Sequence, residues 1–200
     1  MAGCRPFEPD EVSRIRSALL VGPNGLRNSA LHVLGCHSGY RVAELLSLQR
    51  CDVIRPDGSV ADSILVRGKG RRLRAMPIHP TARPDLVRWL IEQQRTGHAE
   101  PEQHLFPVSA KQARAILRDA CRTAAVHGGD RTIGTHSWRK TFAQGVYRQC
   151  LRRLATGDLV DPIFETMRAL GHSDPATTVR YLIDIRSASS VLSTSIEVMS

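Results

Sequence analysis

We expect a mainly α fold with one small antiparallel β-sheet (α+β) from three features of the sequence. Apolar residues recur every three or four positions along most of the chain, which is the period of an amphipathic helix. The period changes between residues 63 and 78, where two short aliphatic runs flank the turn Gly68-Lys69-Gly70. No linker-like stretch interrupts the pattern, so residues 1–200 are predicted to form a single domain.

Breaks in the apolar period set the bounds of each expected element. The run Val21-Gly22-Pro23-Asn24-Gly25 ends the first helix, Gly39 ends the second, and Arg55-Pro56-Asp57-Gly58 forms a turn before the hairpin. The two strands are expected over residues 64–66 and 73–78. The expected helices cover residues 8–20, 26–37, 41–48, 82–96, 109–126, 136–154, 162–170 and 175–185.

Composition points to a polyanionic partner. The formal net charge is +9, and no basic amphipathic helix with an aromatic edge favours a membrane surface over nucleic acid. No apolar run approaches the ~20 residues of a membrane span, and the N-terminus lacks a signal-peptide core, so a cytoplasmic protein is expected.

The five cysteines are scattered and contain no CxxC pair, which argues against a disulfide framework and a zinc ribbon. A metal site at Cys36, His37 and His32 is conceivable. Small buried thiols beside helical histidines are the favoured interpretation, because no second ligand cluster has usable spacing.

Two arginines each begin a helical face that is otherwise apolar. Arg41 shares its face with Leu45 and has Glu44 one turn away, while Arg139 lies on one stripe with His136 and Ala143. A buried guanidinium needs a partner. Internal salt bridges are one explanation, and a shared external anion is the other, because the planar fork of arginine binds phosphate oxygens in pairs.

Two further positions allow either an incidental or a functional interpretation. Lys69 lies between two glycines and before Arg71, Arg72 and Arg74, which fits a solvated basic hairpin or a loop that approaches a phosphate closely. Tyr181 is predicted on the side of its helix that apolar residues avoid, which weakens its interpretation as a core aromatic.

Four ordered segments resemble the motifs of the tyrosine recombinases, the phage-integrase superfamily. "SGYRVAELLSL" is similar to the first arginine box, "VRGKGRRLRAMPI" to the β-hairpin that carries a lysine, "GTHSWRKTFA" to the His-x-x-Arg box and "LGHSDPATTVRYL" to the final histidine-to-tyrosine box. The resemblance covers residues from about 36 to 186. Trp138 stands where a leucine or methionine is commoner, and Lys140 where a histidine often is.

The resemblance implies a catalytic set with a role for each member. Two arginines would hold the phosphate, one histidine would accept the proton of the nucleophilic tyrosine, a lysine would protonate the leaving 5′ oxygen, and a second histidine would donate a hydrogen bond to the phosphate. An acidic residue, Glu44, matches the one that follows the first arginine. Arg41 and Arg139 are the two arginines, His136 is the proton acceptor, and Tyr181 is the nucleophile. Lys69 is the lysine, and His172 is the second histidine.

The implied product is a 3′-phosphotyrosine and a free 5′-hydroxyl, and religation then needs neither ATP nor metal. We therefore expect no cofactor, and the sequence has no GxxxxGK[ST] loop and no clustered acidic residues. Double-stranded DNA is the expected partner. Arg71, Arg72, Lys111 and Arg114 are candidate phosphate contacts, although solvated surface charge explains them almost as well.

The resemblance also raises questions about assembly. Family members usually carry an N-terminal helical domain that clamps the DNA, and the first arginine here is already residue 41, so we expect a short form without that domain, or a fragment. Residues 187–200 are expected to dock on a neighbouring protomer in a tetramer on DNA, or else to pack on their own domain. Rival functions are a type IB topoisomerase and a catalytically silent DNA-binding accessory protein.

Overall fold

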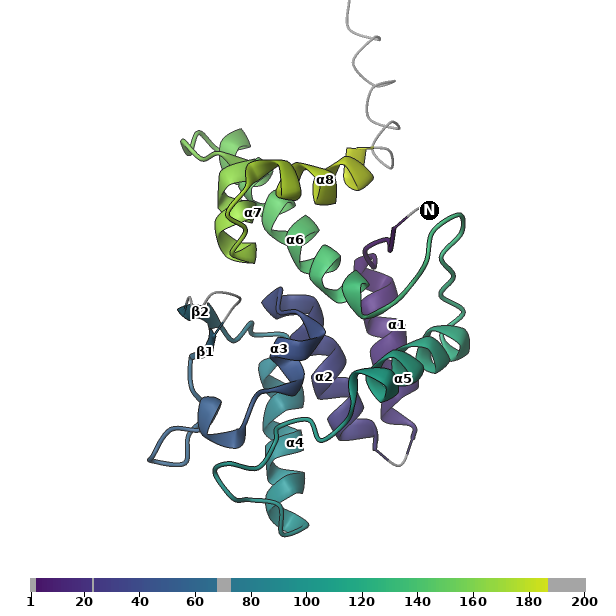
Figure 1. Cartoon of the computed structure of the whole chain (residues 1–200), viewed down its shortest axis with the longest axis vertical. Coiled ribbons are helices and arrows are strands. Elements are labelled where there is room, and N and C mark those ends of the chain that lie inside the picture. Colours follow the sequence, from purple (N-terminus) through teal and green to yellow (C-terminus); the bar gives the residue numbers. More distant parts are fainter. Residues whose placement is uncertain (1–2, 23, 68–72, 187–200) are drawn as a thin grey trace, which may run out of the picture. The chain divides into compact units, whose positions relative to one another are not determined.

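The helices and strands follow the chain in the order that Figure 1 labels. The structure, a computed structural model, describes residues 3–22, 24–67 and 73–186. Its contacts divide the chain into two compact units, Met1–Phe142 and Ala143–Ser200. The elements are α1 (Pro9–Leu20), α2 (Gly25–Ser38), α3 (Val42–Leu46), the 3-10 helix η1 (Arg50–Asp52), β1 (Ser63–Arg67), β2 (Leu73–Pro77), α4 (Arg83–Arg95), α5 (Ala110–Thr123), α6 (Thr135–Ala155), α7 (Pro162–Leu170) and α8 (Pro175–Arg186).

These elements confirm the predicted fold class, a mainly helical protein with a small antiparallel sheet. The predicted helix over 41–48 is shorter in the structure, because Arg41 is the N-cap of α3 and the helix ends at Leu46. The carbonyl of Leu48 instead accepts a hydrogen bond from the backbone of Leu105. The prediction of one domain over residues 1–200 stays a prediction.

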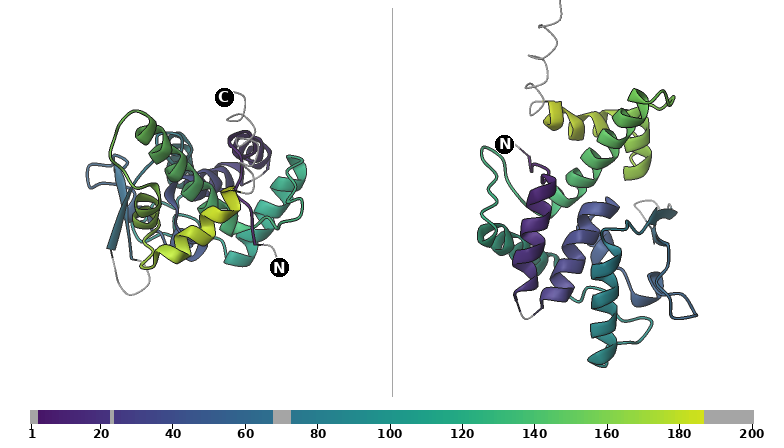
Figure 2. Two further views of the ribbon diagram at one scale, coloured as in Figure 1. Left: turned by 90° about the horizontal axis from the view of Figure 1, so that it is seen from above. Right: turned by 180° about the vertical axis from the view of Figure 1, so that it is seen from behind.

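Helix α2 is the centre of the first unit. It lies between α1 and α4, as Figures 1 and 2 show, and α1 also packs against α5. Eight consecutive residues of α2, from Ser29 to Cys36, are buried, which is the pattern of a helix that is covered on all sides. The turn that carries Arg41 therefore follows directly from a buried central helix.

A buried carboxylate ties α1, α2 and α4 together. The side chain of Asp85 is 2 % exposed and accepts hydrogen bonds from Arg16 Nε at 2.7 Å and Arg16 Nη2 at 2.8 Å. Ser29 Oγ donates at 2.6 Å, and Arg88 makes a further short contact. Burial alone would raise the pKa of Asp85, but these donors outweigh it and lower the pKa to about 2. We call these four residues the Asp85 cluster.

The two strands form the predicted hairpin. β1 pairs antiparallel with β2, and the register places Ser63 opposite Pro77 and Leu65 opposite Ala75. Ile64 and Val66 are buried while Leu65 is exposed, as expected for a strand with one face on the core. The turn that carries Lys69 lies outside the described residues.

The second unit contains most of α6 together with α7 and α8, and α7 packs against α8. Asp161 caps α7, because its Oδ1 accepts hydrogen bonds from the backbone of Ile163 and Phe164 at 2.8 and 3.1 Å. Gly171 ends α7 in the left-handed region, with φ 66°. Within the described ranges, no helix is both long and apolar enough to cross a membrane.

Candidate active site

The turn between α2 and α3 determines where the first arginine lies. Gly39 adopts φ 65°, a conformation that favours glycine, and a Cβ at this position would lie 2.3 Å from the ring of Phe142. Two residues later Arg41 has extended backbone angles and caps the N-terminus of α3. Glycine is therefore required here on two independent grounds, and the chain leaves the turn with Arg41 at a helix start.

Arg41 is held by a carboxylate but remains accessible. Glu44 Oε2 accepts a hydrogen bond from the Arg41 backbone at 2.7 Å, and Glu44 Oε1 accepts one from Arg41 Nη1 at 3.1 Å. A second arginine, Arg74 of β2, lies 3.6 Å from Glu44 Oε2. The Arg41 side chain is 45 % exposed. The internal salt bridge that the sequence allowed is thus present, and we call these three residues the Glu44 cluster.

Tyr40 connects this cluster to the hairpin. Its hydroxyl donates to the carbonyl of Ile64 in β1 at 2.9 Å, and the guanidinium carbon of Arg74 lies 5.1 Å from its ring centroid. Burial raises the pKa of the Tyr40 phenol far above its usual value. Tyr40 therefore stays protonated and acts as a structural tyrosine that orients the base of the hairpin.

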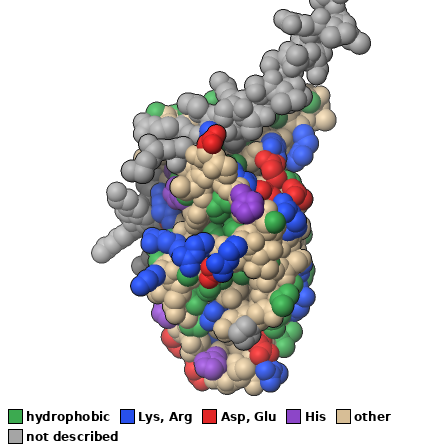
Figure 3. Space-filling view, turned by 90° about the vertical axis from the view of Figure 1, so that its right-hand side faces the viewer, with side chains coloured by type: hydrophobic (Ala, Val, Ile, Leu, Met, Phe, Trp, Pro, Cys, Tyr) green, Lys and Arg blue, Asp and Glu red, His purple; other side chains and the backbone are tan. Residues whose placement is uncertain are grey.

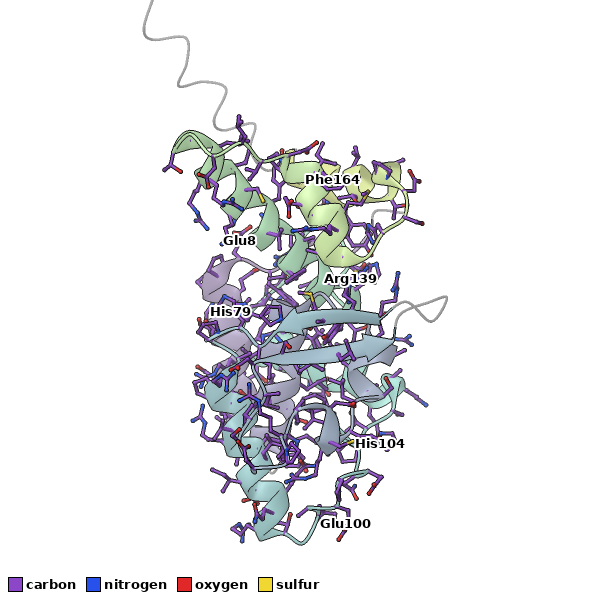
Figure 4. All side chains as sticks on the ribbon, turned by 90° about the vertical axis from the view of Figure 1, so that its left-hand side faces the viewer. Glu8, His79, Glu100, His104, Arg139 and Phe164 are labelled. Carbon is purple, nitrogen blue, oxygen red and sulfur yellow. The ribbon has the colours of Figure 1, made fainter. Side chains whose placement is uncertain are left out.

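The second arginine box lies at the start of α6, where Figure 4 labels Arg139. Arg139 is 1 % exposed and donates through Nη1 to the carbonyl of Gly39, in a short contact. The turn that positions Arg41 therefore also holds the side chain of Arg139. Both arginines of the predicted set converge on the α2–α3 turn within one unit of the protein.

His136 lies one helical turn before Arg139 and is exposed on one side. Partial burial of the ring lowers its pKa, and the positive charges of Arg139, Lys140 and Arg41 lower it further. His136 is therefore predominantly neutral at pH 7 and able to accept a proton.

Trp138 anchors the start of α6 to α2. Its Nε1 donates to Nδ1 of His32 at 2.9 Å, and Nε2 of His32 lies 3.2 Å from the carbonyl of Val12. Gly35 leaves room for the indole, since a Cβ there would lie 2.9 Å from it. Sequence reasoning missed this pair, although the unusual residue at position 138 was the signal that could have found it.

The histidines near Cys36 make contacts within the protein. Burial lowers the pKa of His32 to about 4, and burial together with the adjacent His79 lowers the pKa of His37 to about 4. The rings of His37 and His79 are stacked with centroids 4.3 Å apart. Among the described residues, no group of three or more His, Cys, Asp or Glu side chains could hold a metal ion.

The final box belongs to the second unit. Gly171 turns the chain after α7, and the backbone of His172 donates to the carbonyl of Met167 at 3.0 Å. Nδ1 of His172 lies 2.9 Å from Oγ1 of Thr178. The His172 ring meets the Tyr181 ring edge-on, with centroids 5.3 Å apart and planes at 67°. The structure thus brings the predicted histidine and tyrosine together.

Tyr181 is half-buried, whereas the sequence pattern placed it on an exposed polar side. Its contact with His172 explains the difference, because the histidine ring covers part of the phenol. Leu182, the next residue, is 5 % exposed and lies on the packed face of α8 as predicted. A helical wheel takes no account of residues outside the helix, so it assigns an aromatic residue to solvent even when a neighbouring loop contacts it.

The candidate DNA-binding residues divide into two groups. Lys111 and Arg114 are exposed on α5, which lies on the side of the protein seen in Figure 3, where Lys and Arg side chains gather. Arg118 and Arg122 follow on the same helical stripe and lie 3.3 and 3.5 Å from Asp119. Lys69, Arg71 and Arg72 lie outside the described residues, as does the expected docking tail 187–200.

Comparisons with known proteins agree on one family. The sequence profile described as "Phage integrase family" matches residues 5–185. Tyrosine recombinase XerC of Xanthomonas axonopodis pv. citri is 30 % identical over 178 residues, which cover 88 % of this chain and 52 % of XerC. The probable integrase/recombinase YoeC of Bacillus subtilis is 29 % identical, over 78 % of this chain and 77 % of YoeC.

Solved structures share the fold. The XerA recombinase superposes with a TM-score of 0.67 at 22 % identity, over 94 % of this chain and 63 % of XerA. The catalytic domain of bacteriophage HP1 integrase gives a TM-score of 0.56 at 19 % identity, over 98 % of this chain and 95 % of that domain. The chain spans about half the length of the XerC relatives that it matches.

Proposed function

The chain belongs to the phage integrase family, the tyrosine recombinases, and from this premise we propose that it cleaves and rejoins double-stranded DNA at specific sites through a covalent 3′-phosphotyrosine at Tyr181. The observation that carries the proposal is that the α2–α3 turn positions Arg41 and also holds Arg139, with His136 one helical turn before Arg139 on α6. Two guanidinium groups beside a neutral histidine suit a phosphodiester and the proton transfer that its cleavage needs.

The arginines supply the electrostatic part of the mechanism. Arg41 and Arg139 bind the two non-bridging oxygens and stabilise the charge that develops on them as phosphorus becomes pentacoordinate. Gly39 holds Arg139 before substrate arrives, and the surroundings of this buried guanidinium must open for a phosphate oxygen to reach it. Arg41 exchanges part of its contact with Glu44 for the phosphate, and Arg74 remains as a counter-ion for the carboxylate.

Bond breaking and proton transfer follow. Tyr181 Oη attacks phosphorus and passes its proton to His136, so that a phosphorus–Oη bond forms as the phosphorus–O5′ bond breaks. Lys69 protonates the departing O5′, and His172 donates a hydrogen bond to the phosphate. A 5′-hydroxyl of another strand later attacks the phosphotyrosine and restores the phosphodiester, which conserves the bond energy. We propose that the reaction takes place in the cytoplasm.

Surface charge supports DNA as the partner. The chain carries a formal net charge of +9, and the exposed side chains of Lys111 and Arg114 lie on one stripe of α5. Structural neighbours include the XerH recombinase bound to its difH substrate and a λ integrase dimer bound to a core site. We propose that this protein likewise assembles on DNA as a homo-oligomer, a tetramer on two sites.

A trapped covalent intermediate tests the proposal. A library of nicked duplexes with randomised sites is incubated with the protein, and adducts that resist denaturation are isolated and sequenced. We expect an adduct that Tyr181→Phe abolishes and that Tyr147→Phe, a change at another half-buried tyrosine, leaves intact. Intact DNA binding without any adduct would contradict the proposal and support a silent accessory protein.

A second step separates the two enzyme classes. Selected sites are placed in pairs on a supercoiled plasmid, and the products are mapped by sequencing. Strand exchange between the two sites supports a recombinase. Relaxation of supercoils without exchange would instead support a type IB topoisomerase.

A further inference from the structure

Two adjacent threonines of α8 lie in opposite environments. Thr177 is exposed, and its Oγ1 lies 3.5 Å from Asp174 Oδ2. Thr178 is 0 % exposed, and its Oγ1 lies 2.9 Å from Nδ1 of His172. A buried hydroxyl costs free energy unless it is hydrogen-bonded. The buried threonine therefore depends on the histidine in a way that the exposed one does not.

The direction of this hydrogen bond follows from where the hydroxyl proton can go. Across the described part of the chain, Nδ1 of His172 is the only hydrogen-bond partner recorded for Thr178 Oγ1. If Nδ1 carried the proton, the hydroxyl would accept the bond and its own hydrogen would be buried without an acceptor. The satisfied arrangement has Thr178 donating to Nδ1 of a neutral imidazole.

The direction of the bond determines the tautomer of the ring. A neutral imidazole has one protonated and one bare nitrogen, so a bare Nδ1 requires the proton on Nε2. A histidine that donates to a phosphate oxygen through Nε2 needs this tautomer. The opposite tautomer would present a lone pair to an anion and repel it.

The same contact fixes the orientation of the ring. Thr178 lies three residues before Tyr181 on α8, and the His172 ring meets the Tyr181 ring edge-on at 5.3 Å. His172 itself follows α7, so the Thr178 hydroxyl links the ring to the helix that presents the tyrosine. We propose that Thr178 is a positioning residue that holds His172 in the Nε2-protonated tautomer and keeps its ring edge-on to the ring of Tyr181. This inference rests on the proposed function for its catalytic consequence.

The first test reads the tautomer directly. Nitrogen chemical shifts of the imidazole, measured by long-range proton–nitrogen NMR, report which nitrogen carries the proton and whether the other accepts a hydrogen bond. We expect Nε2 to be protonated in the unchanged protein, with Nδ1 shifted by the threonine. A proton on Nδ1 would overturn the inference. This measurement needs no substitution that could prevent folding.

The second test compares three threonine variants in the trapped-adduct assay. Thr178→Val keeps the shape but removes the donor, and we expect adduct formation to slow about tenfold, as when one aligned hydrogen bond is lost. Thr178→Ser restores the hydroxyl and should recover most of the rate. Thr177→Val, at the exposed neighbour, is the matched control and should leave the rate unchanged.

The outcomes distinguish this inference from the proposed function. If the unchanged protein forms no Tyr181-dependent adduct, the proposed function fails, while the NMR measurement still decides whether Thr178 sets the tautomer. If the adduct forms and Thr178→Val, folded as judged by its NMR spectrum, matches the unchanged protein, the positioning role is wrong. Equal losses in Thr178→Val and Thr178→Ser would also contradict it, because they would indicate a packing effect.

Discussion

Two carboxylates of the first unit are each surrounded by arginines, yet they are built for different tasks. Asp85 is 2 % exposed and receives donors from α1 and α2, which are distant in the sequence, as well as from Arg88, three residues further along α4. Glu44 is 11 % exposed, and its principal partner is Arg41, only three residues away. One cluster joins three helices, whereas the other orients a single side chain at a turn.

The two clusters differ in how easily an arginine could move away from the carboxylate. Arg16 makes two hydrogen bonds to Asp85, so withdrawing it would strand a buried charge. Arg41 makes one side-chain hydrogen bond to Glu44 and is 45 % exposed, while Arg74 stays near the carboxylate. The Asp85 carboxylate is buried and stays paired with Arg16 even if the more exposed Arg88 moves away, whereas the Glu44 cluster can release the guanidinium of Arg41 to an external anion.

The largest expected effect on stability comes from removing the carboxylate of the Asp85 cluster. Asp85→Ala leaves two partly exposed arginines and the buried Ser29 Oγ without their acceptor, and the loss of these charge-assisted hydrogen bonds should lower the unfolding free energy by about 2–4 kcal/mol. Urea denaturation followed by circular dichroism measures the change. The matched control is Asp119→Ala, which also has two arginine neighbours but is partly exposed, and should change stability by about 0.5 kcal/mol or less. Equal effects would erase the distinction.

Acid should weaken the first unit in two separate pH ranges. His32 has a folded-state pKa of about 4, below its unfolded value of about 6.5, so the folded state binds fewer protons. Its contribution is complete above about pH 6.5 and is lost as the pH falls toward 4, by up to about 3 kcal/mol. Asp85, with a pKa of about 2, loses its contribution only between about pH 4 and 2.

Unfolding free energies at several pH values check this prediction. His32→Gln can still accept from Trp138 and donate to Val12 but does not titrate, so its stability should fall less between pH 6.5 and 4 than that of the unchanged protein. His98→Gln changes an exposed histidine and is the control. A steep loss of stability between pH 6.5 and 4 that persists in His32→Gln would assign the effect to another group, of which His37 is the first candidate.

The sequence was sufficient for the elements, it left the connections between them open, and the roles of the catalytic side chains stay predictions. Helical periodicity placed the bounds of most helices within two residues, because burial of one face leaves a local pattern. The Arg41–Glu44 pair was one of two stated alternatives, since both residues belong to one helix start. Long-range partners leave no such pattern.

Three connections show why. Arg139 donates to a backbone carbonyl at Gly39, and every residue has such a carbonyl, so no side-chain pattern marks this one. Asp85 follows a proline at a helix start, where an acidic residue is common for local reasons, and its buried partners are visible only in three dimensions. The Thr178–His172 bond joins a loop to a helix. The neighbouring Thr177 is the same residue type but is exposed, so residue type alone does not reveal which threonine makes the bond.

A smaller effect on stability, with a larger one on function, is expected at the Glu44 cluster. Glu44→Gln should lower the unfolding free energy by about 1 kcal/mol or less, because the pair with Arg41 is partly exposed. It removes a negative charge beside two arginines, so affinity for duplex DNA should rise, while adduct formation should fall because Arg41 loses its orientation. Fluorescence anisotropy and the trapped-adduct assay measure the two effects.

A matched variant and a double-mutant cycle sharpen this prediction. Glu92→Gln removes a carboxylate that pairs with Arg95 at the same three-residue spacing on α4, so it changes the net charge equally and should leave adduct formation intact. Arg74→Met should cost activity in the presence of Glu44 and little in the Glu44→Gln background, which gives a coupling of about 0.5 kcal/mol or more. Additive effects would show that Arg74 does not act through Glu44.

The smallest expected effect lies outside both clusters and sets the scale against which they are judged. Ala125 follows α5 with φ 52°, which glycine adopts more readily than alanine, and the backbone of Val126 donates to Cys121 at 2.8 Å to close the helix end. Ala125→Gly should therefore stabilise the protein by about 0.5–1 kcal/mol in urea denaturation, despite the greater backbone entropy of the unfolded chain. Ala124→Gly, one residue earlier at φ −80°, has no strain to relieve and should destabilise it slightly. If the two variants behaved alike, backbone strain at position 125 would be absent.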